Sequence, residues 1–371
     1  MNERILLASP HMSDEGYELE YIHDAFAKNW VAPLGENVNE FEKAMAAFLG
    51  EGSTVALSAG TAALHLSMIL AGVKAGDMVF CQDLTFSASA NPITYLGAEP
   101  VFIDSDRDTW NMDPAALEKA FALYGKPKAV VVVHLYGNPA KLDEICAICD
   151  KYGVPLIEDA AEALGSTYGG RKCGTFGKFG ILSFNGNKII TSSGGGMLVC
   201  RDEHDAKHAL KLATQAREAF PWYQHEEIGY NYRLSNICAG IGRGQMKVLP
   251  SRIEKKRAIF ERYAENLKGL PLTLQPENGV SNRWLSVALL DENCSVSFMQ
   301  VLDALNAANI EGRPVWKPMH AQPVFANAKF VSLEEKSVAM DLFERGVCLP
   351  SDTKMELSDV DRICDIIKSL F

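Results

Sequence analysis

The chain has 371 residues, of which 47% are hydrophobic and 22% charged, a composition typical of globular proteins. Its formal net charge of −11 argues against nucleic acid as a partner, because a surface that binds the phosphate backbone needs clustered Lys and Arg. The longest apolar runs, such as residues 129–133, are far too short to span a membrane.

The cysteines predict a reducing compartment. There are nine, scattered singly apart from Cys146 and Cys149, and residues 1–7 lack the basic and long apolar regions of a signal peptide. We therefore expect a cytoplasmic protein with free thiols. Cys146 and Cys149 follow a helical pattern, so we expect buried helix thiols. A metal or redox motif is the less favoured alternative, and we predict no metal site.

Short apolar runs alternate with helical stretches through the first half of the chain. Residues 15–28 and 37–49 are predicted to form helices. Seven candidate strands follow: Thr54–Leu57, Met78–Cys81, Pro100–Ile103, Ala129–Val133, Val154–Ile157, Phe179–Phe184 and Met197–Cys200. Continuous apolar strands separated by helices predict an α/β fold with a mostly parallel seven-stranded sheet, buried on both faces. Ligands of such sheets bind beyond the carboxyl ends of the strands.

The sequence changes character after about Pro250. A charged helix is predicted from Arg252 to Leu267, followed by strands near 272–275 and 284–288 and by helices near 297–309 and 358–370. We expect two domains, a ligand-binding domain of residues 1–250 and a smaller α+β domain of residues 251–371. The N-terminal region, residues 1–30, is expected to pack near the smaller domain.

Two of the predicted strands are followed by candidate ligand-binding residues. Ser58, Gly60 and Thr61 lead directly into an apolar helix, whose first N–H groups could bind a phosphate together with the Thr61 hydroxyl. A simple N-cap by Ser58 or Thr61 is the alternative. Phe86 follows the next strand and could stack on a planar ring, although a phenylalanine is more often part of the core.

Lys188 lies in an unusual place for a lysine. It follows the turn Asn185-Gly186-Asn187 between two apolar segments that are predicted as buried strands, and three glycines come after it at 194–196. An amine kept among apolar side chains and hydroxyls is available as a nucleophile that forms a Schiff base with a carbonyl. This pattern indicates pyridoxal-phosphate chemistry, although a lysine in an ordinary hairpin turn would look the same.

Asp159 supports the same cofactor. It lies where the fifth strand ends and a helix begins, so it could cap that helix or form a salt bridge with the pyridine nitrogen. A protonated pyridine ring acts as an electron sink, which lowers the barrier to proton removal from the substrate carbon. Ser183, five residues before Lys188, would point from a neighbouring strand end and could bind phosphate. The pairing of Asp159 with Lys188 favours the cofactor.

The motifs occur in a recognisable order: Ser58-Ala-Gly-Thr-Ala-Ala-Leu-His65, Glu158-Asp-Ala-Ala-Glu-Ala163, Ser183-Phe-Asn-Gly-Asn-Lys188, the glycine run and Gly229-Tyr-Asn-Tyr-Arg-Leu-Ser-Asn236. Over nearly its whole length the chain resembles the DegT/DnrJ/EryC1/StrS family of nucleotide-sugar aminotransferases. The resemblance implies the fold-type I architecture of pyridoxal-phosphate-dependent transferases, with a smaller C-terminal α+β domain.

The resemblance also implies roles for the residues that face the cofactor. Lys188 would bind the cofactor as a Schiff base and move the proton. Asp159 would pair with the pyridine nitrogen, and Phe86 would stack on the ring. Gly60, Thr61 and Ser183 would hold the phosphate.

Three further features of the resemblance concern assembly and chemistry. Asn231 would reach the phosphate in the neighbouring subunit, which implies a homodimer with shared sites. The usual glutamine near the phenolic oxygen of the cofactor is replaced by Glu162, whose carboxylate would need a proton or another partner. Relatives that remove a sugar hydroxyl carry histidine in place of Lys188, so the lysine favours transamination.

Two segments resemble the branch of the family that aminates a UDP-linked 4-keto-6-deoxy-N-acetylhexosamine, as in bacillosamine biosynthesis. They are residues 29–35 and 313–320. Arg313 and Lys317 would bind the nucleotide diphosphate. His320 and the loop of Asn29, Trp30, Val31 and Ala32 would lie near the sugar. Surface charge in a proline-rich loop is the alternative for the second segment.

The expected reaction is a ping-pong transamination with an amino-acid donor, L-glutamate. The keto sugar would then receive the amino group. Alternatives are amination of a 3-keto sugar, a dTDP or GDP carrier, and a non-catalytic regulatory protein that binds pyridoxal phosphate. The absence of a basic patch from the sequence disfavours the last.

Overall fold

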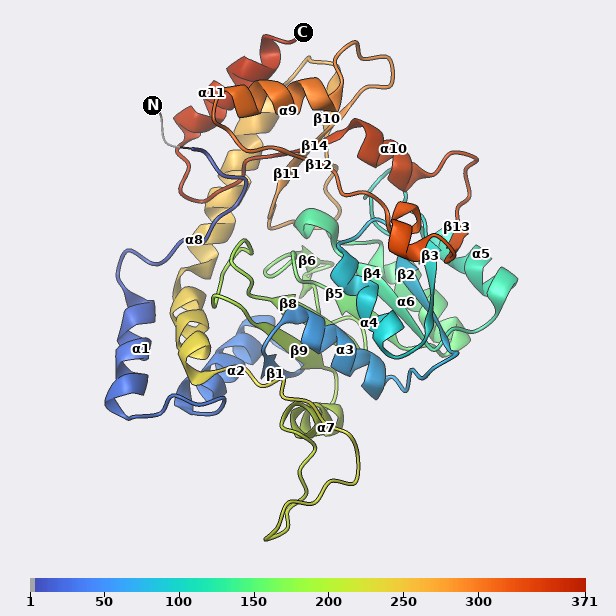
Figure 1. Ribbon diagram of the computed structural model, residues 1–371. Coiled ribbons are helices and arrows are strands. Elements are labelled where there is room, and N and C mark those ends of the chain that lie inside the picture. Colours follow the sequence, from blue (N-terminus) through green and yellow to red (C-terminus); the bar gives the residue numbers. More distant parts are fainter. Residues whose placement is uncertain (1–3) are drawn as a thin grey trace.

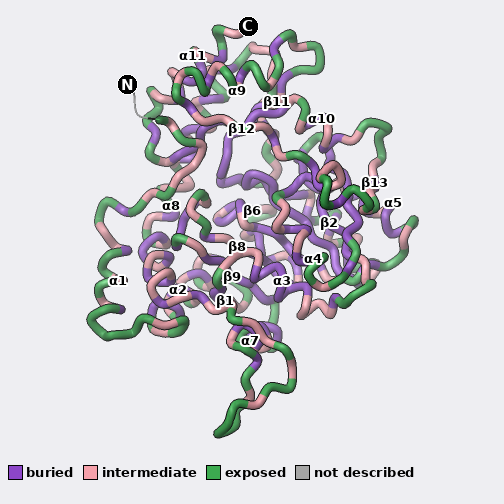
Figure 2. Tube along the Cα trace, in the orientation of Figure 1, coloured by how far each residue is buried: buried purple, intermediate pink, exposed green. Residues whose placement is uncertain are grey.

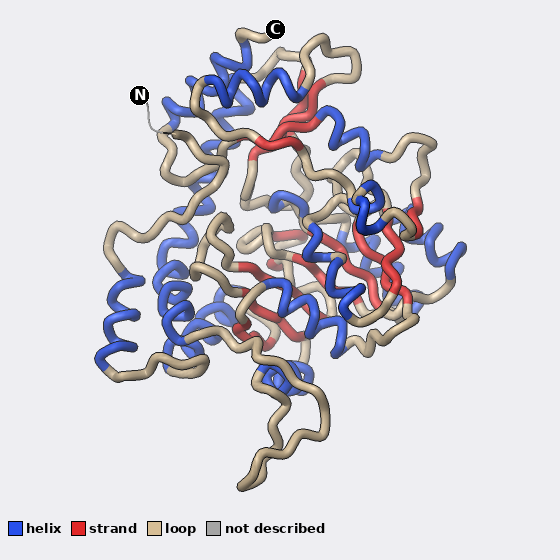
Figure 3. Tube along the Cα trace, viewed as in Figure 1, coloured by secondary structure: helices blue, strands red, loops and turns tan. Residues whose placement is uncertain are grey.

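The computed structural model describes residues 4–371 and consists of a large sheet between helices with a second, smaller sheet beside it (Figures 1 and 3). The strands of the large sheet are β1 Ser53–Leu57, β2 Met78–Gln82, β3 Glu99–Ile103, β4 Ala129–Val133, β5 Leu156–Asp159, β8 Phe179–Ser183, β9 Gly196–Cys200 and β13 Lys329–Val331. The remaining strands are β6 Thr167–Tyr168, β7 Arg171–Lys172, β10 Leu272–Leu274, β11 Ser286–Leu290, β12 Arg313–Pro314 and β14 Gly346–Leu349.

The helices alternate with these strands, as the apolar pattern predicts. They are α1 Tyr17–Ala27, α2 Glu36–Leu49, α3 Gly60–Leu70, α4 Asn91–Tyr95, α5 Pro114–Tyr124, α6 Leu142–Tyr152, α7 Glu203–Ala213, α8 Asn236–Asn266, α9 Phe298–Ala307, α10 Val338–Arg345 and α11 Leu357–Lys368. In the part of the chain that the structure describes, no helix is long and apolar enough to cross a membrane. All nine cysteines are free thiols. Cys149 is buried on α6 as expected, whereas Cys146 on the same helix is only half-buried.

The large sheet is mostly parallel, which confirms the prediction. Its order is β1-β9-β8-β5-β4-β2-β3-β13, and only β9 runs antiparallel to its two neighbours. It has eight strands instead of the predicted seven. The extra strand, β13, pairs with β3 and comes from the C-terminal part of the chain. This segment has only three residues and begins with a lysine, so its sequence does not predict a buried strand.

Both faces of the sheet are buried, because successive side chains of a strand point to opposite sides. Along β4, Val130 and Val132 pack in one apolar cluster with residues of α5 and α6. Val131 packs instead with residues of α3, α4 and α7 on the other face. The strands are accordingly the most deeply buried part of the molecule (Figure 2). Polar groups that contact a ligand must therefore lie at or beyond the ends of the strands.

The helix predicted to begin at Arg252 begins at Asn236, so this prediction is wrong in its start. Ser235 caps the helix by accepting a hydrogen bond from the Cys238 N–H at 3.1 Å, and Pro250 lies inside it. The sequence around Pro250 suggested a break, because proline removes one helical hydrogen bond. The helix continues past it and connects the two sheets (Figure 1). The expected domain boundary at residue 250 therefore falls within α8.

The second sheet is antiparallel in the order β10-β11-β14-β12. The N-terminal segment joins this part of the molecule: the Ile5 N–H donates to the Asn309 carbonyl at 3.2 Å, and the Ser351 N–H donates to the Leu7 carbonyl at 2.8 Å. The loop after α7 projects away from both sheets and is largely exposed (Figures 1 and 2).

Candidate active site

A cavity of about 910 Å³ opens beyond the carboxyl ends of the parallel strands. It is lined from the large sheet by residues that follow β1, β2, β5 and β8, and from the other side by the segment 311–319. Nine of the predicted site residues line it together: Gly60, Thr61, Phe86, Asp159, Glu162, Ser183, Lys188, Arg313 and Lys317.

Lys188 lies in the long loop between β8 and β9. The strands predicted on either side of it, Phe179–Phe184 and Met197–Cys200, are confirmed as β8 and β9, but the connection between them is a long loop and not a tight hairpin. The Lys188 amino nitrogen lies 3.4 Å from Glu162 Oε1 and 4.2 Å from the centroid of the Trp284 indole. The amino group is thus held between a carboxyl group and an aromatic face.

Glu162 is buried beside this lysine, and burial raises the pKa of its carboxyl from 4.5 to about 7. The Lys188 charge and a hydrogen bond from the Tyr136 N–H to Oε2, at 2.7 Å, oppose that rise. Tyr136 reaches this position because its backbone is left-handed, with φ at 57°. A carboxyl group with this pKa can accept and return a proton near neutral pH.

Asp159 lies at the end of β5 and is buried. Its Oδ2 accepts a hydrogen bond from the Ser89 hydroxyl at 2.6 Å, and its Oδ1 accepts one from the Ala161 N–H at 3.1 Å. The Ser89 hydroxyl is in turn bonded to Thr85 Oγ1 at 2.6 Å. These contacts fix an acidic group in the cavity wall, where a protonated ring nitrogen would find its partner.

The start of α3 forms a cradle for an anion. Its N-cap is Ala59, with no side-chain hydrogen bond, so neither Ser58 nor Thr61 caps the helix. A Cβ on Gly60 would lie 3.2 Å from the Ser183 Cβ, and one on Gly196 would lie 2.3 Å from the Gly60 nitrogen. Close approach of these backbones brings the helix start next to the Ser183 hydroxyl, where a phosphate would be bound.

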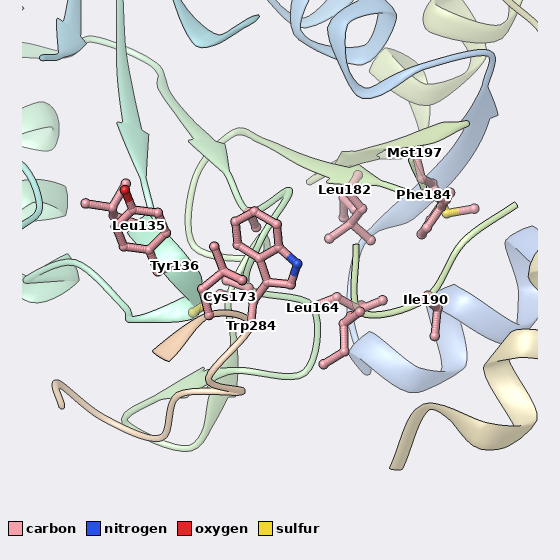
Figure 4. Packing of buried hydrophobic residues seen from close by; sticks show 14 of the residues in the cluster. Leu135, Tyr136, Leu164, Cys173, Leu182, Phe184, Ile190, Met197 and Trp284 are labelled. Carbon is pink, nitrogen blue, oxygen red and sulfur yellow. The ribbon is translucent and has the colours of Figure 1, made fainter. Parts of the chain in front are cut away.

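Aromatic residues form the rest of the cavity wall. Phe86 is 59% exposed at the cavity, and its ring centroid lies 5.7 Å from that of Trp316. Trp316 contacts Tyr136 edge-on at 5.1 Å. Trp284 belongs to the same buried cluster as Tyr136 (Figure 4). Phe86 is accordingly exposed at the cavity, and its stacking on a planar ring stays a prediction.

His320 lies outside the cavity lining found among residues 4–371. Its Nδ1 lies 2.6 Å from Asp83 Oδ2, and its N–H donates to Asp83 Oδ1 at 2.8 Å. The ring stacks on Phe330 at 4.0 Å. In the cavity of its own chain His320 therefore does not line the sugar position; it anchors the loop that carries Trp316 and Lys317.

The loop of Asn29, Trp30, Val31 and Ala32 also lies apart from the cavity lining of the described chain. Asn236 holds it, donating from Nδ2 to the Trp30 carbonyl at 3.0 Å and from its N–H to the Ala32 carbonyl at 2.8 Å. Asn231 is likewise outside, 3.3 Å from the side-chain nitrogen of Gln215. The structure therefore does not bring these residues to the cavity of their own chain.

Sequence reasoning missed Tyr136, Trp284 and Trp316. Trp284 was placed in a strand, whereas it precedes β11 and turns its ring to the cavity. Tyr136 and Trp316 gave no signal, because neither a left-handed tyrosine nor a ring contact across two domains is encoded in a local pattern.

A family model, the DegT/DnrJ/EryC1/StrS aminotransferase family, matches residues 13–368. The chain belongs to the DegT/DnrJ/EryC1/StrS aminotransferase family. It is 52% identical to EpsN of Bacillus subtilis, assigned as a pyridoxal phosphate-dependent aminotransferase, over 100% of this chain and 97% of that protein. It is 35% identical to the GDP-perosamine synthase of Caulobacter vibrioides, over 97% of this chain and 96% of the relative.

The fold agrees with this membership. The aminotransferase TlmJ from Streptoalloteichus hindustanus superposes with a TM-score of 0.89 at 31% identity, covering 98% of each chain. The chain is therefore a fold-type I aminotransferase, with pyridoxal phosphate as its cofactor. The site fits that cofactor: an amine, a buried carboxylate and a glycine-lined helix start converge on one cavity.

The raised pKa of Glu162 predicts a pH-dependent stability. A carboxyl group whose pKa rises from 4.5 to about 7 on folding contributes stability that is complete below pH 4.5 and lost as pH rises through 7. The glutamine in Glu162→Gln does not titrate, so this variant does not lose that stability. Its unfolding free energy minus that of the parent should therefore rise by about 3 kcal/mol between pH 4.5 and pH 8. Urea denaturation of the cofactor-free proteins measures this difference.

The control is Glu144→Gln, which removes a carboxyl group that is exposed to solvent. A pH-dependent gain for Glu162→Gln no larger than that for Glu144→Gln would contradict the buried, proton-accepting carboxyl.

The Asp83–His320 contact predicts how the cavity loop is held. Burial alone would lower the pKa of His320, but the paired Asp83 raises it overall, so the pair is charge-assisted. Asp83→Asn should speed amide exchange in residues 316–320 by about tenfold, because the stronger acceptor is lost. Hydrogen-exchange mass spectrometry measures this. As a control, His204→Gln changes an exposed histidine and should leave exchange in this loop unaffected. If residues 316–320 exchanged equally slowly in Asp83→Asn and in the parent, Asp83 would not hold the loop.

Proposed function

We propose that the chain transfers an amino group from L-glutamate to the 4-keto group of a UDP-linked 4-keto-6-deoxy-N-acetylhexosamine, for bacterial glycan biosynthesis of the bacillosamine type. The observation that carries the proposal is the convergence of Lys188, Glu162 and Asp159 on one cavity whose outer rim bears Arg313 and Lys317. The inner part supports transamination, and the cationic rim suits a nucleotide diphosphate.

The inner residues divide the chemistry between them. When bound, pyridoxal phosphate supplies a carbonyl and an electron-withdrawing ring that carry the amino group between the two substrates. Lys188 is the amine that holds the cofactor and, once released, takes a proton at its nitrogen and delivers it to the substrate carbon. Glu162, 3.4 Å away, balances the charge of the lysine or takes its proton. Asp159, held by Ser89 and the Ala161 N–H, would pair with the ring nitrogen of the bound cofactor.

The rim residues act on the sugar nucleotide. The Arg313 guanidinium is 66% exposed, and Glu311 orients it through a contact of 2.8 Å. The Leu7 N–H donates to the other oxygen of Glu311 at 3.0 Å, so the N-terminal segment supports this arginine. Lys317 lies one residue after Trp316 on the same loop. We assign both cations to the diphosphate, because a dianion needs neutralising charge that the acidic chain provides only locally.

We also propose a homodimer with shared sites. Asn231 and residues 29–32 lie away from the cavity of their own chain, yet Trp30 is 48% exposed and Val31 is 57% exposed. Exposed aromatic and branched side chains of this kind favour contact with another protein surface. A second copy would bring these residues to its partner's cavity.

The substrate proposal is tested with a panel of keto sugars and L-glutamate, following release of 2-oxoglutarate. We expect turnover with the UDP-linked 4-keto sugar and at least about tenfold lower kcat/KM with GDP- or dTDP-linked 4-keto sugars and with a 3-keto sugar. The likeness to GDP-perosamine synthase makes the GDP-linked sugar the strongest competitor.

The control is Lys188→Ala, which should give no turnover with any sugar. Preference for the GDP-linked sugar would refute UDP as the nucleotide carrier, and preference for a 3-keto sugar would refute C4 as the position of amination. Inactivity of the parent with every sugar would favour the regulatory alternative.

The shared site is tested by complementation between two inactive variants. Lys188→Ala and Asn231→Ala are co-expressed with different tags, and the mixed dimer is isolated. If Asn231 serves the partner's site, one site of the mixed dimer is intact and about half of the parent activity returns. If Asn231 serves its own chain, both sites stay defective and the mixed dimer is inactive, which would overturn the proposal.

A further inference from the structure

Trp284 has an unusual number of anchors for a residue that only fills space. Its side chain is buried and belongs to the central apolar cluster (Figure 4), while one face of its ring meets the Lys188 amino group at 4.2 Å. The indole N–H donates to the carbonyl of Asn187 at 2.8 Å. The ring therefore contacts the reactive lysine and also holds the backbone of the residue before it.

The backbone of Trp284 is fixed from two sides. Its N–H donates to the Asn282 side-chain oxygen at 2.9 Å, and its carbonyl accepts a hydrogen bond from the Lys256 ammonium group at 2.9 Å. Lys256 is buried, and burial lowers the pKa of its amino group to about 7. The same nitrogen donates to the Ser351 carbonyl at 2.7 Å, so this lysine ties the backbone of Trp284 to the segment after β14.

Asn282 ties the same segment to the other neighbour of Lys188. Its side-chain nitrogen donates to the Glu162 carbonyl at 2.8 Å and to the Leu164 carbonyl at 3.0 Å. Arg283 lies between Asn282 and Trp284 and has a left-handed backbone, with φ at 52°. This conformation costs energy for any residue other than glycine. One buried amide thus sets the spacing between Glu162 and Trp284.

We propose that Trp284 is a positioning residue that holds the Lys188 amino group whenever the lysine is not bound to the cofactor. A released ammonium group lies between the Glu162 carboxyl and the indole face, and the attraction of a desolvated cation to an indole is strong enough to keep it there. The lysine then stays within reach of the substrate carbon for both halves of the reaction. Asn282 and Lys256 act through Trp284 by fixing its backbone.

This role rests on the transamination chemistry of the chain but not on the identity of the sugar. A direct test is the crystal structure of the parent protein loaded with pyridoxamine phosphate, to which Lys188 cannot be linked. We expect the amino nitrogen within about 6 Å of the Trp284 ring centroid, the range of a cation–π contact. A nitrogen turned away from the ring would overturn the proposal, whatever the substrate proves to be.

Variants supply a second, kinetic test. Trp284→Leu removes the ring, Trp284→Phe keeps a weaker ring, and Trp110→Leu removes another buried indole of the same cluster that lies outside the cavity lining of the described residues. The half-reaction of the pyridoxal-phosphate form with L-glutamate is followed by absorbance in a stopped-flow instrument. Cofactor content is measured beside it.

For Trp284→Leu we expect a loss of about tenfold or more in the maximal half-reaction rate, with half-saturation by glutamate and cofactor content little changed. Trp284→Phe should recover part of the rate, and Trp110→Leu should keep the parent rate. A parent-like rate in Trp284→Leu would overturn the proposal, as would an equal loss in Trp110→Leu. If Trp284→Leu does not fold, Trp284→Phe and the crystal structure still decide the question.

Discussion

The close pairing of Lys188 with Glu162 is the constraint on which the site depends. Burying an ionised carboxyl group costs free energy unless a nearby positive charge or hydrogen-bond donors compensate for the lost water. Lys188 and the Tyr136 N–H stabilise the ionised form of Glu162, and burial raises the pKa of its carboxyl to about 7. A glutamine would be neutral and could not accept the lysine proton. The carboxyl therefore gives the chain a titrating group next to its reactive amine.

This pair is held by contacts that cross from one part of the chain to the other. Asn282 joins the backbone of Glu162 to that of Trp284, and His320 joins the cavity loop to Asp83 at the end of β2. Both donors come from the C-terminal part of the chain, while the acceptors lie in segments that follow strands β5 and β2 of the large sheet. Loops of the C-terminal part thus do more than cover the cavity: Asn282 fixes the backbone of Glu162 relative to that of Trp284, and both of these residues contact Lys188.

The sequence was a good guide wherever a local pattern carries the information. Continuous apolar runs predicted the buried parallel strands, and residues at the strand ends, together with the family resemblance, predicted nine residues that line one cavity. It failed where the outcome depends on distant partners. The strand β13 is recognisable only beside β3, α8 continues through Pro250, and His320 turns to Asp83 instead of the cavity.

The sequence by itself therefore determined the class of fold and the family, and it predicted Lys188 as the reactive amine, because periodicity and motif order are properties of neighbouring residues. Only the tertiary structure decided what surrounds that amine. The aromatic face of Trp284, the left-handed Tyr136 and the raised pKa of Glu162 all arise from residues far apart in the chain that exclude water together. The burial of these particular groups depends on segments that meet only in the assembled fold, so no local pattern encodes it.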